Sequence, residues 1–130
     1  MVKVYLIAQM NTVSRHTIKR SKEEFNLICR RILKGGGIPI SPSLWYVDYN
    51  KDPRLRKELS WWVNEVYAPL MKDCPVLCYK PNLIGIDPTT VEAEKETWKE
   101  LNPLGSMVSS DVILDFLLNY HAAKILKGVS

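Results

Sequence analysis

Short apolar segments alternate with longer segments of helical periodicity, and this alternation is the feature that most restricts the fold. Three apolar segments fit buried strands, at residues 2–8, 38–40 and 75–79. Continuous apolar runs are typical of parallel strands that helices cover on both faces. The alternation therefore predicts an α/β fold, a three-layer Rossmann-like (flavodoxin-like) and mostly parallel sheet with right-handed crossovers.

Helical spacing of apolar residues predicts the elements between and after these strands. The first helix begins near a capping box, Ser21-x-x-Glu24, and ends at the glycines of residues 35–37. A second helix is expected from Asp52 or Pro53 to about residue 72, because aspartate is a good N-cap and proline fits the first helical position. A last helix is expected from residue 109 or 110 to residue 127.

The segment 80–107 breaks the alternation. It contains three prolines and an acidic stretch, and Thr89-x-x-Glu92 is a further capping box that predicts a short polar helix. We therefore expect a single domain over residues 1–130 with an insertion at about 80–107, placed before the last helix. Such an insertion would serve as a lid or as an oligomer contact.

The composition is that of a globular domain and argues against several classes of protein. Of 130 residues, 46% are apolar and 25% are charged, which suits one core and not a disordered chain. No apolar run reaches membrane-spanning length and no signal peptide is evident, so we expect a cytoplasmic protein with no membrane partner. Cys29, Cys74 and Cys78 fit reduced thiols without the spacing of a zinc site, and no metal or cofactor is predicted.

Charge is distributed unevenly along the chain. Residues 1–40 hold eight Lys and Arg against two Asp and Glu, a balance of +6, whereas residues 81–120 hold two against seven, a balance of −5. The basic residues lack the aromatic interleaving of nucleic-acid surfaces, so a nucleic-acid partner is not expected. A small anionic molecule would fit them, as would a helix face that is simply solvated.

Short motifs stand at the ends of the predicted strands and helices. They are residues 5–10 (Tyr-Leu-Ile-Ala-Gln-Met), Phe25 before the glycine turn, Ser41-Pro42, the pair Glu65 and Asp73 eight residues apart, and the pair Ser110 and Asp115. Together they resemble the nucleoside 2-deoxyribosyltransferase-like family, including its small relatives, over most of the chain outside 80–107. The glycines and the threonine of the family's pattern are absent from these motifs.

The resemblance implies cleavage of the N-glycosidic bond of a nucleoside or nucleoside 5′-monophosphate, by hydrolysis or by deoxyribosyl transfer. In the family, a carboxylate on the helix after the third of these strands attacks the anomeric carbon. Asp115 would be this nucleophile, Glu65 would hold the base or assist proton transfer, and Tyr5 would steer the nucleophile through its hydroxyl. Each residue also has a structural alternative. Asp115 could be an acid near a helix N-terminus, Glu65 could pair with a surface lysine or simply face solvent, and Tyr5 could be a strand residue that packs on a helix.

Residues of the predicted loops are candidates for binding the substrate. Basic residues after the first strand could hold a phosphate. Aromatic residues after the second strand could stack on a base, and they could equally form a hydrophobic plug or an oligomer contact. The candidates are Gln9, Met10, Arg15, His16, Ser41, Trp45 and Ser110.

Departures from the family pattern leave a second hypothesis open. Asp111 and Val112 replace small residues that would let a sugar or phosphate approach the backbone. The chain could therefore be a non-catalytic protein that binds or sequesters a nucleotide on the same scaffold. The resemblance also implies a homodimer or larger homo-oligomer, and since Trp61 and Trp62 are adjacent, at most one can face the core.

Overall fold

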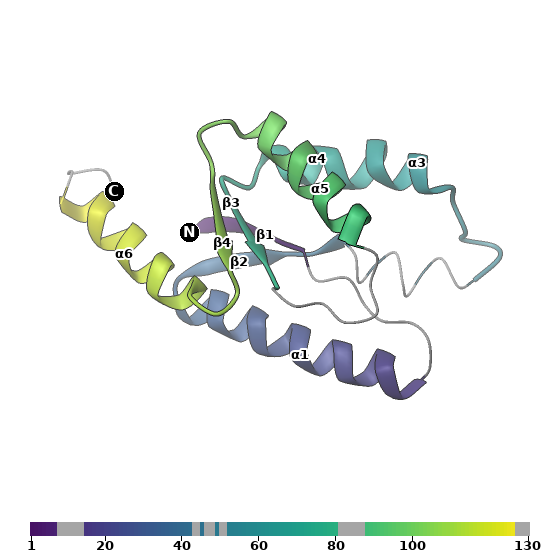
Figure 1. Cartoon of the computed structure of the whole chain (residues 1–130), viewed down its shortest axis with the longest axis horizontal. Coiled ribbons are helices and arrows are strands. Elements are labelled where there is room, and N and C mark those ends of the chain that lie inside the picture. The colour runs from purple at the N-terminus through teal and green to yellow at the C-terminus, as the bar shows by residue number, and fades with distance from the viewer. Residues whose placement is uncertain (8–14, 43–44, 46–48, 50–51, 81–87, 127–130) are drawn as a thin grey trace.

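A computed structural model describes residues 1–7, 15–42, 45, 49, 52–80 and 88–126 of the chain (Figure 1). Within these ranges one sheet of four parallel strands has the order β2-β1-β3-β4. The strands are β1 (Val2–Ile7), β2 (Gly37–Ile40), β3 (Val76–Tyr79) and β4 (Ser106–Ser109). The predicted three-layer α/β fold with a parallel sheet is confirmed.

Helices cover both faces of the sheet, as Figure 1 shows. On one face lie α1 (Arg15–Lys34) and α6 (Ile113–Leu126). On the other face lie α5 (Pro88–Leu101) and a helical segment made of α3 (Leu59–Trp62), η1 (Val63–Tyr67) and α4 (Ala68–Lys72). No helix in the described ranges combines the length and the apolar character that a membrane crossing requires.

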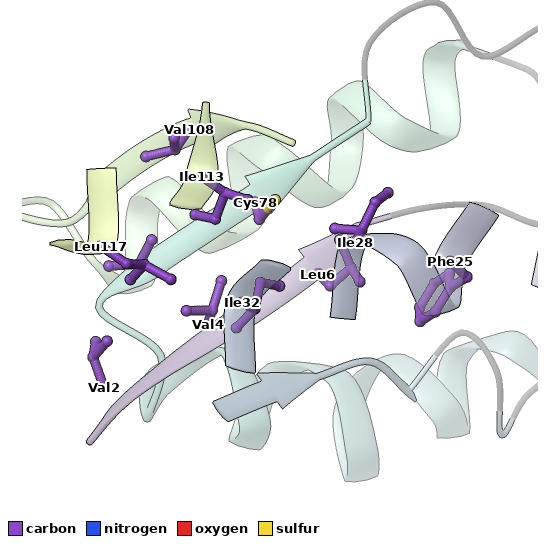
Figure 2. Close-up of a cluster of buried hydrophobic side chains, with 11 residues drawn as sticks. Val2, Val4, Leu6, Phe25, Ile28, Ile32, Cys78, Val108, Ile113 and Leu117 are labelled. Carbon is purple, nitrogen blue, oxygen red and sulfur yellow. The ribbon is translucent and has the colours of Figure 1, made fainter. Parts of the chain in front are cut away.

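Side chains of β1 alternate between two hydrophobic clusters, because successive residues of a strand point to opposite faces. Val4 and Leu6 pack against α1 and α6, and Figure 2 shows them beside Ile32 and Leu117. Tyr5 and Ile7 pack against the helices of the opposite face. The core therefore has two halves, one on each side of the sheet.

The second helix begins later than the sequence indicated. Asp52 and Pro53 lie in a turn, and the helix starts at Leu59. Asp52 Oδ1 accepts the backbone N–H of Arg54 at 2.9 Å, and its carboxylate also pairs with the Arg54 guanidinium. The side chain that was expected to cap a helix stabilises this local turn instead.

The middle of this helical segment is π-helical. The Ala68 N–H donates to the carbonyl of Val63, which is five residues earlier, and Pro69 follows directly. Proline has no N–H to donate, and its ring clashes with the carbonyl four residues before it. A wider turn just before Pro69 relieves that clash, so Pro69 changes the helical register locally and the helix continues to Lys72.

The segment 80–107 is integrated into the alternation where the structure describes it. It holds the whole of α5, and its end begins β4, which pairs with β3 in parallel register. The indole of Trp98 on α5 is fully buried, and its N–H donates to the carbonyl of Cys74 at 2.9 Å. The expected polar helix is therefore present as α5, and Trp98 anchors it in the core. The last helix begins at Ile113 because residues 106–109 form a strand.

Trp98 should therefore contribute to the stability of the whole domain. We expect Trp98→Phe to lower the free energy of unfolding by about 1–2 kcal/mol, because the carbonyl of Cys74 loses a buried hydrogen bond. Urea unfolding followed by far-UV circular dichroism measures this change. The control is Trp61→Phe, at a position that is 41% exposed, which should leave stability nearly unchanged. Equal effects of the two substitutions would contradict the role of Trp98.

Candidate functional site

The topology favours a binding region at the carboxyl ends of the strands. The chain passes from β1 to β2 on one side and then to β3 on the other side of β1. In parallel sheets ligands bind beyond the carboxyl ends of the strands, where the strand order reverses. Ile7, Ile40 and Tyr79 end the three strands that meet there. The described residues near this edge form two groups of polar side chains, one on each face of the sheet.

The first group, named here the Tyr5 cluster, consists of Tyr5, Tyr67 and Glu94. Tyr5 lies on the central strand β1 and is fully buried, and its hydroxyl has no hydrogen-bond partner among the described residues. Burial raises the pKa of this hydroxyl far above its usual value, and the charges of Glu94, Tyr67 and Cys74 raise the pKa further. The phenol therefore stays protonated and can donate a hydrogen bond at any physiological pH.

Glu94 belongs to the side of α5 that faces the sheet. Its residue is half-buried and its Oε2 atom is fully buried, and it stands one helical turn before the buried Trp98. The other acids of α5, Glu92, Glu96 and Glu100, are exposed. Because a charged oxygen is expensive to bury, a carboxylate turned toward the core is a candidate functional group.

The π-helical turn brings Tyr67 to the same region. Tyr67 is the buried residue of η1, and its ring lies 6.3 Å from that of Trp62, which is buried as well. Trp61 is partly exposed, so of the two adjacent tryptophans only Trp62 joins the core. π-helical turns occur frequently at functional sites, and this turn contributes a side chain to the Tyr5 cluster.

A lysine of α5 adds positive charge at the end of β3. Lys95 Nζ lies 4.2 Å from the centre of the Tyr79 ring and 3.2 Å from Glu92 Oε1. This arrangement holds the ammonium group against the face of the ring, where it is attracted to the π electrons. The cation is thus fixed one residue along α5 from the Glu94 carboxylate.

The second group lines a cavity of about 250 Å³ on the opposite face of the sheet, named here the α1 groove. It lies between α1 and the segments that follow β3 and β4. Its lining residues are Glu24, Leu27, Ile28, Arg31, Lys80, Ser110 and Asp111. The groove therefore combines two cations and two carboxylates with an apolar wall.

Protein groups hold both cations of the α1 groove. Lys80 Nζ pairs with the Glu24 carboxylate, and Arg31 Nη1 donates to the carbonyl of Ser110 at 3.2 Å. Partial burial lowers the pKa of Lys80, and the nearby charge of Arg20 lowers it further. An added anion would stabilise the charged form of Lys80, so the groove suits a ligand with a negative group.

The three predicted catalytic residues do not come together in the structure. Asp115 is exposed in the first turn of α6, and Glu65 is exposed in η1, which covers the other face of the sheet. Tyr5 points to the face of η1 and α5, away from α6. The carboxylate whose charge acts on the Tyr5 hydroxyl is therefore neither of these two but that of Glu94.

The predicted substrate-binding residues are distributed over several places. The Ser41 hydroxyl donates to the carbonyl of Leu6 at 3.2 Å at the carboxyl edge, whereas Trp45 is exposed. Ser110 is buried and lines the α1 groove. Arg15 and His16 begin α1, and no position of their side chains is described. Gln9 and Met10 lie outside the described residues.

Sequence reasoning missed Glu94, Lys80 and Arg31. A usable signal for Glu94 was its spacing from Trp98, because residues four apart on a helix share one face. Lys80 and Arg31 carried no comparable signal. Within the described parts of the chain, no group of three or more His, Cys, Asp or Glu side chains is arranged to hold a metal ion.

Comparisons of the chain with protein-family models, with curated proteins and with solved structures found no match. The resemblance to nucleoside 2-deoxyribosyltransferase-like proteins therefore stays a hypothesis. The functional argument depends on the geometry of the Tyr5 cluster and of the α1 groove.

The Tyr5 hydroxyl should lower stability, because a buried polar atom without a partner carries its full desolvation penalty. We expect Tyr5→Phe to leave the free energy of unfolding at pH 7 unchanged or to raise it by up to about 1 kcal/mol. The difference should widen above about pH 10, where unfolded tyrosine ionises. The folded-state pKa is raised, so the wild-type protein loses stability as the pH rises and the variant lacks this loss.

Urea unfolding at neutral and alkaline pH measures this effect. Tyr79→Phe is the matched control, since Tyr79 is only half-buried and its aromatic contact with Lys95 survives the substitution. A clear loss of stability in Tyr5→Phe at pH 7 would show that the hydroxyl has a structural partner.

Proposed function

We propose that the chain cleaves the N-glycosidic bond of a nucleoside or nucleoside 5′-monophosphate, with Glu94 as the nucleophile. The observation that carries this proposal is the burial of the Tyr5 hydroxyl in the same region as the Glu94 carboxylate, close to the carboxyl edge of the sheet. A protonated phenol and a carboxylate in one region of the core are a suitable pair for covalent catalysis at a sugar carbon.

The chemistry requires one carboxylate and a means of orienting it. The Glu94 carboxylate would attack the anomeric carbon through an oxocarbenium-like transition state, and the C–N bond would break as the base leaves with its electron pair and gains a proton. Water or a second base would then release the sugar from the covalent ester. The neutral Tyr5 hydroxyl would donate a hydrogen bond that orients the carboxylate before attack.

Two observations favour Glu94 over Asp115 in this role. The resemblance assigns the nucleophile to the helix that follows the third strand, and in this chain that helix is α5. Asp115 lies on α6, which packs on the face of the sheet opposite to Tyr5. A nucleophile at Asp115 would have to act without Tyr5.

Incubation with a panel of ribonucleosides, deoxyribonucleosides, their 5′-monophosphates and NAD, followed by chromatography of free base, tests the proposal. We expect the wild-type protein to release base from at least one compound. Glu94→Gln should reduce the rate at least about a hundredfold, because an amide cannot form the glycosyl ester. Glu96→Gln is the matched control on an exposed position of the same helix and should keep the wild-type rate.

Asp115→Asn and Glu65→Gln complete the set of variants. Both should retain activity if Glu94 is the nucleophile. Loss of base release in Asp115→Asn with full activity in Glu94→Gln would return the nucleophile to α6. Absence of base release from every compound would count against glycosidic cleavage by this chain.

The α1 groove favours a second candidate function, the binding of an intact nucleotide. Lys80 and Arg31 would attract a phosphate, and the carboxylates of Glu24 and Asp111 would accept hydrogen bonds from sugar hydroxyls. The groove lies on the opposite face from the Tyr5 cluster, so this function does not need a nucleophile. It predicts stoichiometric binding without a product.

Calorimetric titration with nucleoside 5′-monophosphates tests this second candidate. We expect Lys80→Met and Arg31→Met to weaken binding by at least about tenfold, since each removes a charged contact to phosphate. Arg30→Met is the control, because Arg30 is an exposed neighbour of Arg31 that does not line the groove. Equal affinities of Arg31→Met and Arg30→Met would remove the groove as the binding site.

A further inference from the structure

The segment that leads from β2 into η1 presents aromatic rings to solvent. Among the residues that the structure describes, three Trp or Tyr side chains are exposed, and all three lie in this segment. They are Trp45, Tyr49 and Trp61, with exposed fractions of 44%, 53% and 41%. Aromatic side chains are enriched where a surface binds another molecule, so this segment is a candidate interaction surface.

Exposed cations stand between the rings along the chain. Residues 49–61 hold four Lys and Arg against two Asp and Glu. The three of these cations that the structure describes are all exposed, and Lys57 Nζ lies 5.6 Å from the centre of the Trp61 ring. Planar rings thus alternate with positive charge. The set, named here the Trp61 surface, consists of Tyr49, Arg54, Arg56, Lys57 and Trp61.

Local hydrogen bonds give the Trp61 surface a defined backbone. The Asp52 N–H donates to the carbonyl of Tyr49 at 3.2 Å, and the Leu55 N–H donates to the carbonyl of Asp52 at 2.9 Å. The Asp52 carboxylate pairs with Arg54, whose side chain is still 88% exposed. Figure 1 shows this turn projecting from the body of the molecule just before α3. Rings and cations on an ordered turn lose less conformational freedom when they bind a partner.

We propose that the Trp61 surface binds single-stranded nucleic acid. In a single strand the bases are open to stacking, and each base carries a phosphate beside it. The exposed rings would stack on bases, while the cations would pair with phosphates. Lys57 and Trp61 already hold a cation against a ring, which is the pair of groups that one nucleotide requires.

The pattern of the surface favours nucleic acid over other anionic partners. A lipid surface takes up a continuous apolar face, whereas here rings alternate with cations. An acidic peptide would pair with the cations but would leave the rings without planar partners. The expectation of no nucleic-acid partner came from residues 1–40, whose basic residues lack aromatic interleaving, and residues 49–61 supply that interleaving.

Fluorescence anisotropy of a short labelled oligothymidylate, titrated with the full chain at low salt, tests the proposal. We expect saturable binding of the single strand. A blunt duplex of the same length should bind at least about tenfold more weakly, because its bases are already stacked inside. Trp61→Leu should weaken binding of the single strand at least about tenfold, since it removes a stacking ring. Trp61→Phe is the matched control, which keeps a ring and should keep most of the affinity.

A salt titration of the same complex tests the cations. Arg56→Gln and Lys57→Gln should each weaken binding and reduce the slope of log affinity against log salt by about 0.7, because each removes one phosphate contact. Arg30→Gln is the control for a cation elsewhere, since Arg30 is exposed on α1, and it should leave the affinity and the slope unchanged.

Several results would overturn the proposal. They are absence of oligothymidylate binding, equal binding of the duplex, wild-type affinity in Trp61→Leu, and equal losses in Arg30→Gln and Arg56→Gln. Tighter binding to vesicles of anionic phospholipid or to polyglutamate than to oligothymidylate would assign the surface to another partner and would overturn the proposal as well. The assay measures binding alone, so its outcome does not depend on glycosidic cleavage by Glu94.

Discussion

The central strand β1 is the constraint on which the rest of the structure depends. It pairs with β2 on one side and β3 on the other, and its residues from Val4 to Ile7 are fully buried. Both hydrophobic clusters are built on this strand, one on each face. Tyr5 is the one residue of this buried stretch with a polar side chain, so its hydroxyl is the point at which the packing of the core and the chemistry of the candidate site meet.

Most of the fold follows from residue patterns, and the exceptions have local causes. The buried strands β1 and β3 were predictable because they are continuous apolar runs, whereas β4 has serines at both ends and lies at an edge, so it carries no such signal. Asp52 resembles a helix cap in the sequence, but its carboxylate is already engaged by Arg54, two residues away. The acids of α5 indicate a solvated helix, and Glu92, Glu96 and Glu100 are indeed exposed, but the single residue Trp98 anchors the helix in the core.

The candidate site was less predictable than the fold, because it depends on which helix follows which strand. Tyr5 could be predicted from its place in the first strand. Asp115 was predicted as the nucleophile because it follows Ser110 at the spacing of the family's motif. That prediction assumed that the last helix comes directly after the third strand. With β4 in place, α5 is the helix that follows the third strand, and it carries Glu94, whose charge raises the pKa of Tyr5. A missed edge strand of four residues thus changes which helix follows the third strand, from α6 to α5.

The sheet separates the two candidate sites, so the physical argument for each site is independent of the other. The Tyr5 cluster combines a buried carboxylate oxygen of Glu94 with the buried hydroxyl of Tyr5, which has no partner among the described residues and therefore lowers stability. Groups that lower stability persist where function requires them, so this cluster is the stronger candidate for catalysis. In the α1 groove, Lys80 pairs with Glu24 and Arg31 donates to the Ser110 carbonyl. Because these cations already have partners, a bound anion would replace one partner by another, which suits reversible binding. Because the sheet lies between the two groups, a substitution in one should leave the other intact, and the two functions can be assigned separately.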